Sequence, residues 1–123
     1  AEYFKISQPD PFMTLAPKVR RSKRSEIPAA VHFDGTGRFQ TVSRATNRRY
    51  YDLIAEFGRL TGVPVLLNTS FNRQEPIVSR PSEAVSCYLR TGMDVLAIGD
   101  RYVTDRNSKS RAWAERTFVQ GPI

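Results

Sequence analysis

The sequence predicts an α/β (α+β) fold, a twisted mixed open sheet with two main helices packed on it. The chain of 123 residues has the length of a single domain. Its apolar share of 40 % is enough to form a core. Short extended apolar segments alternate along the chain with two stretches of helical periodicity. This order of elements indicates a mixed sheet covered by helices.

The first third of the chain contains two predicted extended regions. Residues 12–19 form a mostly apolar run bounded by prolines, which is typical of a strand. Residues 31–42 predict a hairpin-like unit, with a turn at residues 34–37 and a period of two from residue 38 onward. Residues 18–24 hold five cations in seven positions, which favours a solvated loop or sheet edge over a nucleic-acid patch.

The next region predicts a capped helix followed by a buried strand. Asn47 can cap the helix, and Gly62 can end it in a left-handed conformation. The run at residues 63–67 is continuously apolar, which is the pattern of a strand covered on both faces. The apolar face of the helix is expected to consist of Tyr50, Leu53, Ile54, Phe57 and Leu60.

A second helix is predicted to begin at Pro81 and to end at Gly92. Residues 95–98 predict another buried strand, with residues 102–103 as candidates to pair after it. The apolar face of this helix is expected to consist of Ala84, Val85, Tyr88 and Leu89.

The charge of the chain is +7 and is concentrated in its first part. Residues 1–49 carry ten basic and four acidic side chains, and residues 50–123 carry nine and eight. Fifteen of the nineteen cations are Arg, whose rigid fork suits phosphate or carboxylate, although a solvated surface accounts for this bias equally well. The single cysteine, Cys87, is expected to pack in the core of a cytoplasmic protein, and one His with one Cys argues against a classical zinc site. No run reaches the roughly 18 apolar residues of a membrane span.

Two segments carry residues suited to ligand binding. At residues 63–72, a buried strand runs directly into small polar residues, and ligands in open α/β sheets lie at the carboxyl ends of strands. An ordinary turn that bonds its own backbone is the alternative. At residues 32–40, alternation places His32, Asp34, Arg38 and Gln40 on one side, and Arg38 is a candidate phosphate clamp. A surface hairpin is the alternative there.

Together these motifs resemble the C-terminal domain of the O-carbamoyltransferases. The resemblance rests on HFDGTGRFQTV at residues 32–42, VPVLLNTSFN at residues 63–72, EPIV at residues 75–78 and CYLRTGMDVLAIGD at residues 87–100. AEYFKISQPDPFM at residues 1–13 also fits, so the match covers about five-sixths of the chain. This family includes nodulation-factor carbamoyltransferases and enzymes that modify antibiotics.

The resemblance implies a partial YrdC-like domain over residues 1–104, followed by a basic extension at residues 105–123 with room for one short helix. Such a domain makes carbamoyl-adenylate from carbamoyl phosphate and ATP with Mg²⁺. A separate N-terminal Kae1-like domain of the same polypeptide would hold an iron-type metal and pass the carbamoyl group to an acceptor hydroxyl compound. Cationic segments that precede this region in the family are missing here, so we expect the isolated chain to be inactive.

The resemblance also assigns residues, position by position. Arg38 is expected to contact phosphate, and Arg38 and Ser70 are the expected catalytic residues. The other expected contacts to the nucleotide or carbamoyl phosphate are Asn68, Thr69, Asn72, His32, Asp34 and Glu75. No metal ligand is expected in this chain, and neither a membrane nor nucleic acid is the expected partner.

Two other hypotheses stay open. A basic YrdC-like sheet could bind RNA or another polyphosphate, because a positive face attracts any polyanion. Alternatively, the chain could be a structural lobe that completes a sheet, in which case Ser70→Ala would change stability but not substrate affinity.

Overall fold

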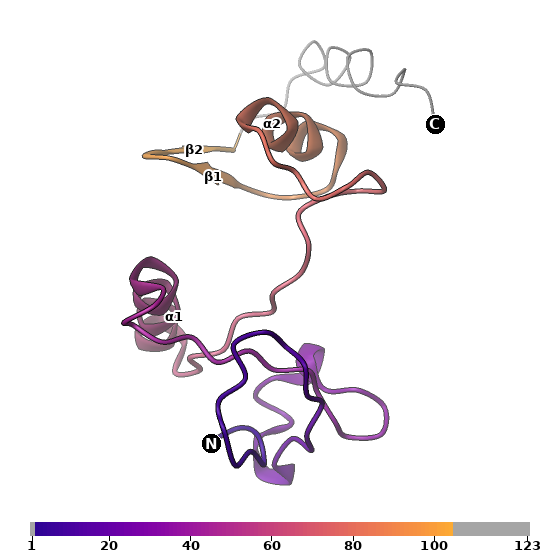
Figure 1. Ribbon diagram of the computed structural model, residues 1–123, viewed down its shortest axis with the longest axis vertical. Coiled ribbons are helices and arrows are strands. Elements are labelled where there is room, and N and C mark those ends of the chain that lie inside the picture. Colours follow the sequence, from indigo (N-terminus) through magenta and orange to yellow (C-terminus); the bar gives the residue numbers. More distant parts are fainter. Residues whose placement is uncertain (1, 105–123) are drawn as a thin grey trace. The chain divides into compact units, whose positions relative to one another are not determined.

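The computed structural model describes residues 2–104, which form two compact units that divide between Asn68 and Thr69 (Figure 1). Its helices and strands confirm the mixture of α and β structure that the sequence predicts. None of the helices within residues 2–104 is both long and apolar enough to cross a bilayer. The expected extension at residues 105–123 lies outside the described residues. In order, the elements are η1 (Arg21–Lys23), η2 (Pro28–Ala30), α1 (Arg48–Thr61), α2 (Pro81–Arg90), β1 (Leu96–Ile98) and β2 (Arg101–Val103).

Helix α1 of the first unit begins and ends where the sequence predicts. The Asn47 side chain accepts a hydrogen bond from the Tyr50 N–H at 3.2 Å, which satisfies one of the free donors of the first turn. Gly62 follows the helix at a φ of 81° and donates its N–H to the Gly58 carbonyl oxygen.

The apolar face of α1 is covered only in part. Tyr50 and Ile54 are half-buried, whereas Leu53 and Leu60 are 57 % and 68 % exposed. The core of the first unit is instead built on Tyr3, Val19 and Ile27. Helical periodicity thus identifies the apolar face correctly but overestimates how much of it is buried within this unit.

The strands expected at residues 12–19, 31–42 and 63–67 are absent from the first unit as described, and to this extent the predicted sheet is wrong. Isolated bridges join Phe4 to Val19 and Lys18 to Thr36. Between residues 2 and 68, no strand pairing extends beyond such single bridges. A strand needs a paired neighbour for its N–H and C=O groups. Residues 63–67 make a local Val65 N–H to Val63 carbonyl bond instead.

The turn predicted at residues 34–37 is present but lies two residues earlier, at residues 32–35. Gly35 donates its N–H to the His32 carbonyl oxygen, and His32 donates to the Thr36 carbonyl oxygen, both at 2.8 Å. Gly35 has a φ of 78°, a conformation that glycine adopts without steric cost.

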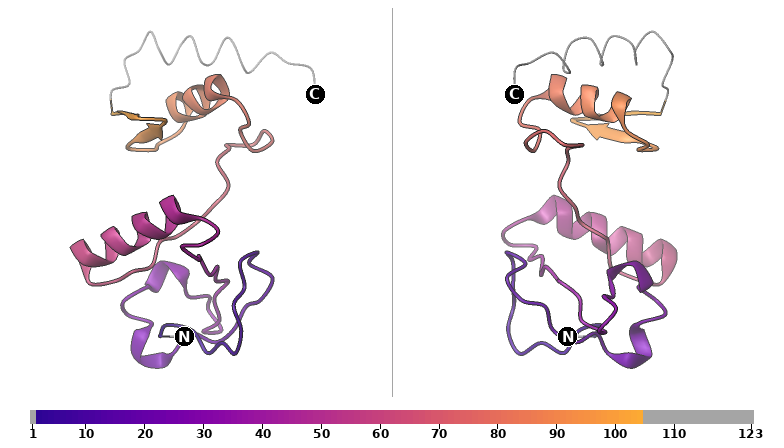
Figure 2. Two further views of the ribbon diagram at one scale, coloured as in Figure 1. Left: turned by 60° about the vertical axis from the view of Figure 1, so that its left-hand side comes forward. Right: turned by 90° about the vertical axis from the view of Figure 1, so that its right-hand side faces the viewer.

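In the second unit, helix α2 lies over the antiparallel pair β1–β2 (Figures 1 and 2). Leu96 pairs with Val103 and Ile98 with Arg101, so the pairing expected after residues 95–98 is confirmed. The helix ends at Arg90, two residues before the expected Gly92. The core that holds the two elements together consists of Ala84, Tyr88, Leu89 and Leu96.

Candidate functional site

A cavity of about 530 Å³ lies within the first unit and brings together three of the expected binding residues. His32, Arg38 and Asn68 all line it. Its apolar wall includes Tyr50 and Ile54, which α1 supplies from its half-buried side. The cavity therefore combines an apolar wall with a few polar groups, the usual composition of a small-molecule site. These groups are the Arg38 guanidinium, the amides of Gln40 and Asn68, the His32 imidazole and the Glu2 carboxylate.

Arg38 lies in a segment, residues 38–42, that lines the cavity throughout, and burial alternates along the chain from Gly37 to Gln40. Gly37 and Phe39 are buried, and the Phe39 ring stacks on Phe4 with 5.4 Å between ring centroids. Arg38 and Gln40 are exposed and line the cavity. The period of two that the sequence predicts is thus present, although no regular strand forms here.

The Arg38 guanidinium is fixed at one edge. Its Nε and Nη2 donate to the Met13 carbonyl oxygen at 3.3 and 2.9 Å. Three of the five N–H groups of the fork are not used by these two bonds. A guanidinium held in this way is preoriented to bind an oxyanion with its remaining donors.

Gln40 connects Asn68 to the loop that follows Asp10, a role that the sequence does not predict for it. The Asn68 amide donates from Nδ2 to Gln40 Oε1 at 3.0 Å, and Gln40 Nε2 donates to the Pro11 carbonyl oxygen at 3.0 Å. The alternation that groups Gln40 with Arg38 was the available signal for this role.

His32 and Asp34 flank the turn and differ in their relation to the cavity. His32 lines the cavity, and the distance between its Nδ1 atom and Thr36 Oγ1 is 3.0 Å. Asp34 does not line it, because its Oδ1 accepts from the Thr36 N–H and hydroxyl at 2.9 and 2.7 Å. These bonds from Thr36, with the nearby Lys18, hold the pKa of Asp34 below its usual value.

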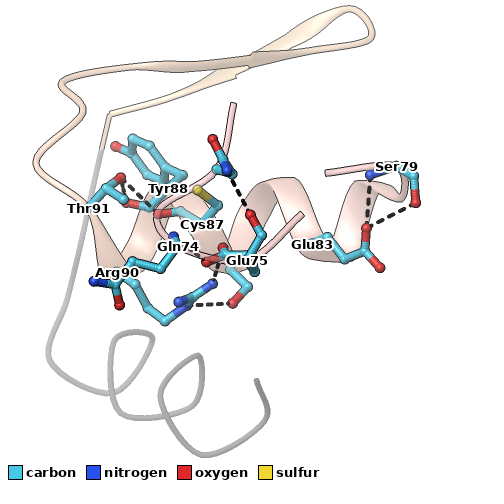
Figure 3. A network of polar contacts seen from close by, with 10 residues as sticks. Gln74, Glu75, Ser79, Glu83, Cys87, Tyr88, Arg90 and Thr91 are labelled. Atoms are coloured by element: carbon cyan, nitrogen blue, oxygen red, sulfur yellow. Dashed lines mark hydrogen bonds and ion pairs between the residues drawn. The ribbon is translucent and has the colours of Figure 1, made fainter. Parts of the chain in front are cut away.

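In the second unit, Asn72 and Glu75 belong to a network that stabilises their own loop. Figure 3 shows Glu75 and Arg90 within this network. Asn72 Nδ2 donates to the Glu75 carbonyl oxygen at 2.7 Å, and Arg90 Nη2 donates to Glu75 Oε1 at 2.6 Å. The Gln74 N–H, other backbone donation and the Arg90 guanidinium lower the pKa of Glu75 to about 2, against the opposing effect of burial. The Arg90 side chain is only 8 % exposed.

Cys87 lies beside this network and has the packing role that the sequence predicts. It is fully buried, and burial is the main cause that raises the pKa of its thiol. A thiol in such surroundings is a poor nucleophile.

Thr69 and Ser70 differ from their neighbours in having free hydroxyls. Both residues are exposed, and neither side chain makes a hydrogen bond within the described part of the chain. They follow Asn68 directly in the sequence, at the division between the units. Of the loop residues expected to bind ligand, they are the ones whose side chains make no hydrogen bond within residues 2–104.

The cationic run at residues 18–24 is anchored more firmly than a solvated loop would be. Val19, its second residue, is 1 % exposed and belongs to the core. Lys23 pairs with Glu26 at 2.9 Å, and Arg24 donates from Nε to the Val19 carbonyl oxygen at 3.3 Å. The burial of Val19 could not be predicted from the sequence, because it is the only apolar residue among the cations of this run.

The resemblance implies Mg²⁺ together with ATP. No three side chains of His, Cys, Asp or Glu gather within residues 2–104 in a way that could hold a metal ion. We therefore assign no residue of this region to the metal.

Comparison with known proteins identifies the family to which the chain belongs. Residues 1–105 match the family described as Carbamoyltransferase C-terminus. Nodulation protein NolNO of Sinorhizobium fredii is 43 % identical over 98 % of this chain and 18 % of its own length. Nodulation protein NolO of Bradyrhizobium diazoefficiens is 42 % identical over 93 % of this chain and 22 % of its own length. Nodulation protein U of Rhizobium tropici is 41 % identical over 58 % of this chain and 12 % of its own length. The chain thus spans about a fifth of the first two relatives.

Proposed function

Because the chain belongs to the Carbamoyltransferase C-terminus family, we propose that it is the nucleotide-binding part of an ATP-dependent O-carbamoyltransferase. In this role it binds ATP and carbamoyl phosphate and supports formation of carbamoyl-adenylate. The acceptor hydroxyl compound, the Kae1-like domain and its iron-type metal belong to a larger cytoplasmic protein, of which this chain would supply the C-terminal region.

The observation that carries this proposal is the placement of Arg38 in the cavity of the first unit. The cavity volume of about 530 Å³ lies within the range of small-molecule sites. Its apolar wall, with Tyr50 and Ile54, suits a flat base, and the free donors of Arg38 suit a phosphate. Both halves of a nucleotide would find a complementary surface.

The chemistry of adenylation fits a site built on preoriented donors. Water first cleaves carbamoyl phosphate into carbamate and inorganic phosphate, and a carbamate oxygen then bonds to the α-phosphorus of ATP. Pyrophosphate leaves in this second step, so negative charge moves between phosphates. A fixed guanidinium that stabilises this charge lowers the barrier, and no nucleophilic side chain is needed.

Different roles follow for the other expected site residues. Ser70 and Thr69, with free hydroxyls, and Asn68, at the cavity, would bind oxygens of the nucleotide or carbamoyl group. His32 would lie at the edge of the same cavity. Asn72, Glu75 and Asp34 would support the site by holding their loops in place.

The finer fold assignment follows the same proposal. A YrdC-like sheet would have to be completed by strands of the full-length protein, because strands require paired neighbours. The exposed apolar residues Leu53, Leu60 and Leu67 are consistent with such additional contacts.

The test is a titration of the full-length protein with ATP and, separately, with single-stranded RNA at low and at high salt. We expect saturable ATP binding that Arg38→Ala weakens. Arg59→Ala is the matched control, because Arg59 is exposed, pairs with Glu56 on α1 and lies outside the cavity. Steeply salt-dependent RNA binding without any response to ATP would instead support the polyphosphate-binding alternative.

A further inference from the structure

The orientation of Arg38 depends on an unusual residue, Met13. Its carbonyl oxygen accepts hydrogen bonds from both Nε and Nη2 of Arg38. The direction of this carbonyl therefore decides which edge of the guanidinium faces the cavity. Met13 has a φ of 57°, in the left-handed region that residues with a Cβ rarely adopt. Surrounding interactions must hold such a residue in place.

A buried carboxylate supplies these interactions. Asp10 is 3 % exposed, and its Oδ2 accepts from the Leu15 N–H at 2.7 Å while its Oδ1 accepts from the Phe12 N–H at 3.2 Å. The two bonded N–H groups lie on either side of Met13 in the sequence. One carboxylate thus closes the loop around the left-handed residue.

The same loop is joined to the segment that carries Arg38. The Asp10 carbonyl oxygen accepts the Thr41 N–H at 2.9 Å, and the Pro11 carbonyl oxygen accepts Gln40 Nε2 at 3.0 Å. These bonds, with those of Arg38 to Met13, fix the loop and residues 38–41 to each other. All the groups belong to the first unit.

The carboxylate is charged at neutral pH. Burial acts to raise the pKa of Asp10, but the N–H groups of Leu15 and Phe12, with Thr14, outweigh burial and hold the pKa below its ordinary value. A charged acceptor makes stronger hydrogen bonds to backbone donors than a neutral one.

We propose that Asp10 is a positioning residue for phosphate binding: it closes the loop of residues 10–15, and through the Met13 carbonyl it sets the edge that Arg38 presents to the ligand. This inference rests on the proposed function, because it takes Arg38 as the residue that binds phosphate. It adds a second residue, outside the cavity, on which that binding depends.

The experiment is a double-mutant cycle in the full-length protein, with KM for ATP and kcat of carbamoyl-adenylate formation as readouts. Asp10→Asn removes the charge and one acceptor, and we expect at least a fivefold rise in KM for ATP. In the Arg38→Ala background the same change should alter KM by less than twofold, because Asp10 acts through Arg38. Asp52→Asn, an exposed carboxylate on α1 that pairs with Arg48, is the control and should leave KM unchanged.

Each other outcome has a separate meaning. An equal loss in both backgrounds would overturn the inference and show that Asp10 serves folding alone. An unchanged KM in Asp10→Asn, with a raised KM in Arg38→Ala, would also overturn it but leave the proposed function intact. An unchanged KM in Arg38→Ala would instead contradict the proposed function. Should Asp10→Asn not yield folded protein, Asp10→Ser, which keeps one acceptor oxygen, carries the same cycle.

Discussion

Arg90 and Glu75 form an ion pair that ties the loop after the NTSFN motif to helix α2, with 2.6 Å between Nη2 and Oε1. The Arg90 side chain is almost completely buried, whereas Glu75 retains about a third of its exposure. A buried cation needs its partner, because removing one charge leaves the other uncompensated. Glu75 therefore stabilises its own loop. Asn72, which donates a hydrogen bond to the Glu75 carbonyl oxygen, has the same structural role.

Glu75→Gln should destabilise α2 in a manner that depends on pH. The pKa of Glu75 falls from 4.5 to about 2 in the folded protein, so its stabilisation is present above pH 4.5 and is lost as the pH falls toward 2. We expect a loss of about 1–2 kcal/mol near neutral pH, which allows for solvent screening of the exposed part of the side chain. Hydrogen exchange of the α2 amides in the full-length protein measures this loss.

Glu56→Gln is the control for that experiment. Glu56 pairs with Arg59 on the exposed surface of α1, so its replacement should leave the exchange of α2 unchanged. A difference between wild type and Glu75→Gln that stays constant from neutral pH to pH 3 would contradict the assigned role of the ion pair.

Ser70→Ala should reduce ligand affinity without changing stability. The Ser70 hydroxyl makes no hydrogen bond within residues 2–104. Its removal should therefore leave the free energy of unfolding unchanged. One lost hydrogen bond to ligand corresponds to a roughly threefold to tenfold weaker affinity for ATP or carbamoyl phosphate. Calorimetric titration and thermal unfolding of the full-length protein measure the two quantities.

Ser79→Ala should show the opposite behaviour. Ser79 Oγ donates to Glu83 at the start of α2, so its loss should affect stability and leave affinity unchanged. Lower stability with unchanged affinity in Ser70→Ala would favour a purely structural lobe.

Gly58→Ala should destabilise the first unit although it lies inside a helix. Alanine in place of glycine usually stabilises a helix interior by about 0.5–1 kcal/mol. A Cβ at position 58 would lie 2.7 Å from the Cβ of Pro64, which is too close for either backbone to stay in place. We expect a net loss of about 1 kcal/mol, measured by hydrogen exchange of α1, with Arg59→Ala as the neighbouring control. A gain in protection at α1 would show that the contact with Pro64 is not tight.

Local rules of sequence predicted much of the fold. Asn47 and Gly62 fix the ends of α1 through side-chain and backbone bonds that depend on neighbours in the sequence. Pro81 opens α2, and the apolar positions Ala84, Tyr88 and Leu89 are buried as periodicity predicts. Such features are readable because a helix satisfies its backbone groups within itself.

Features that depend on distant partners could not be read in the same way. Residues 63–67 have the composition of a buried strand, but whether they pair depends on neighbours elsewhere, and Leu67 is 68 % exposed in the first unit. The role of Asp10 was equally hidden, because no spacing rule predicts that a carboxylate will close a loop around a left-handed Met13. Arg38 was found because its motif resembles that of a family, and alternation alone could not separate it from a surface hairpin.

Formation of carbamoyl-adenylate by the full-length protein, compared between wild type and Arg38→Ala, tests the central claim most directly. The reaction requires ATP and carbamoyl phosphate, and its rate is measured from the pyrophosphate that it releases. Arg59→Ala is the control. We predict that wild type and Arg59→Ala react equally and that Arg38→Ala is at least tenfold slower, about 1.4 kcal/mol in the barrier. A wild-type rate in Arg38→Ala would contradict the assignment of the cavity as the phosphate site.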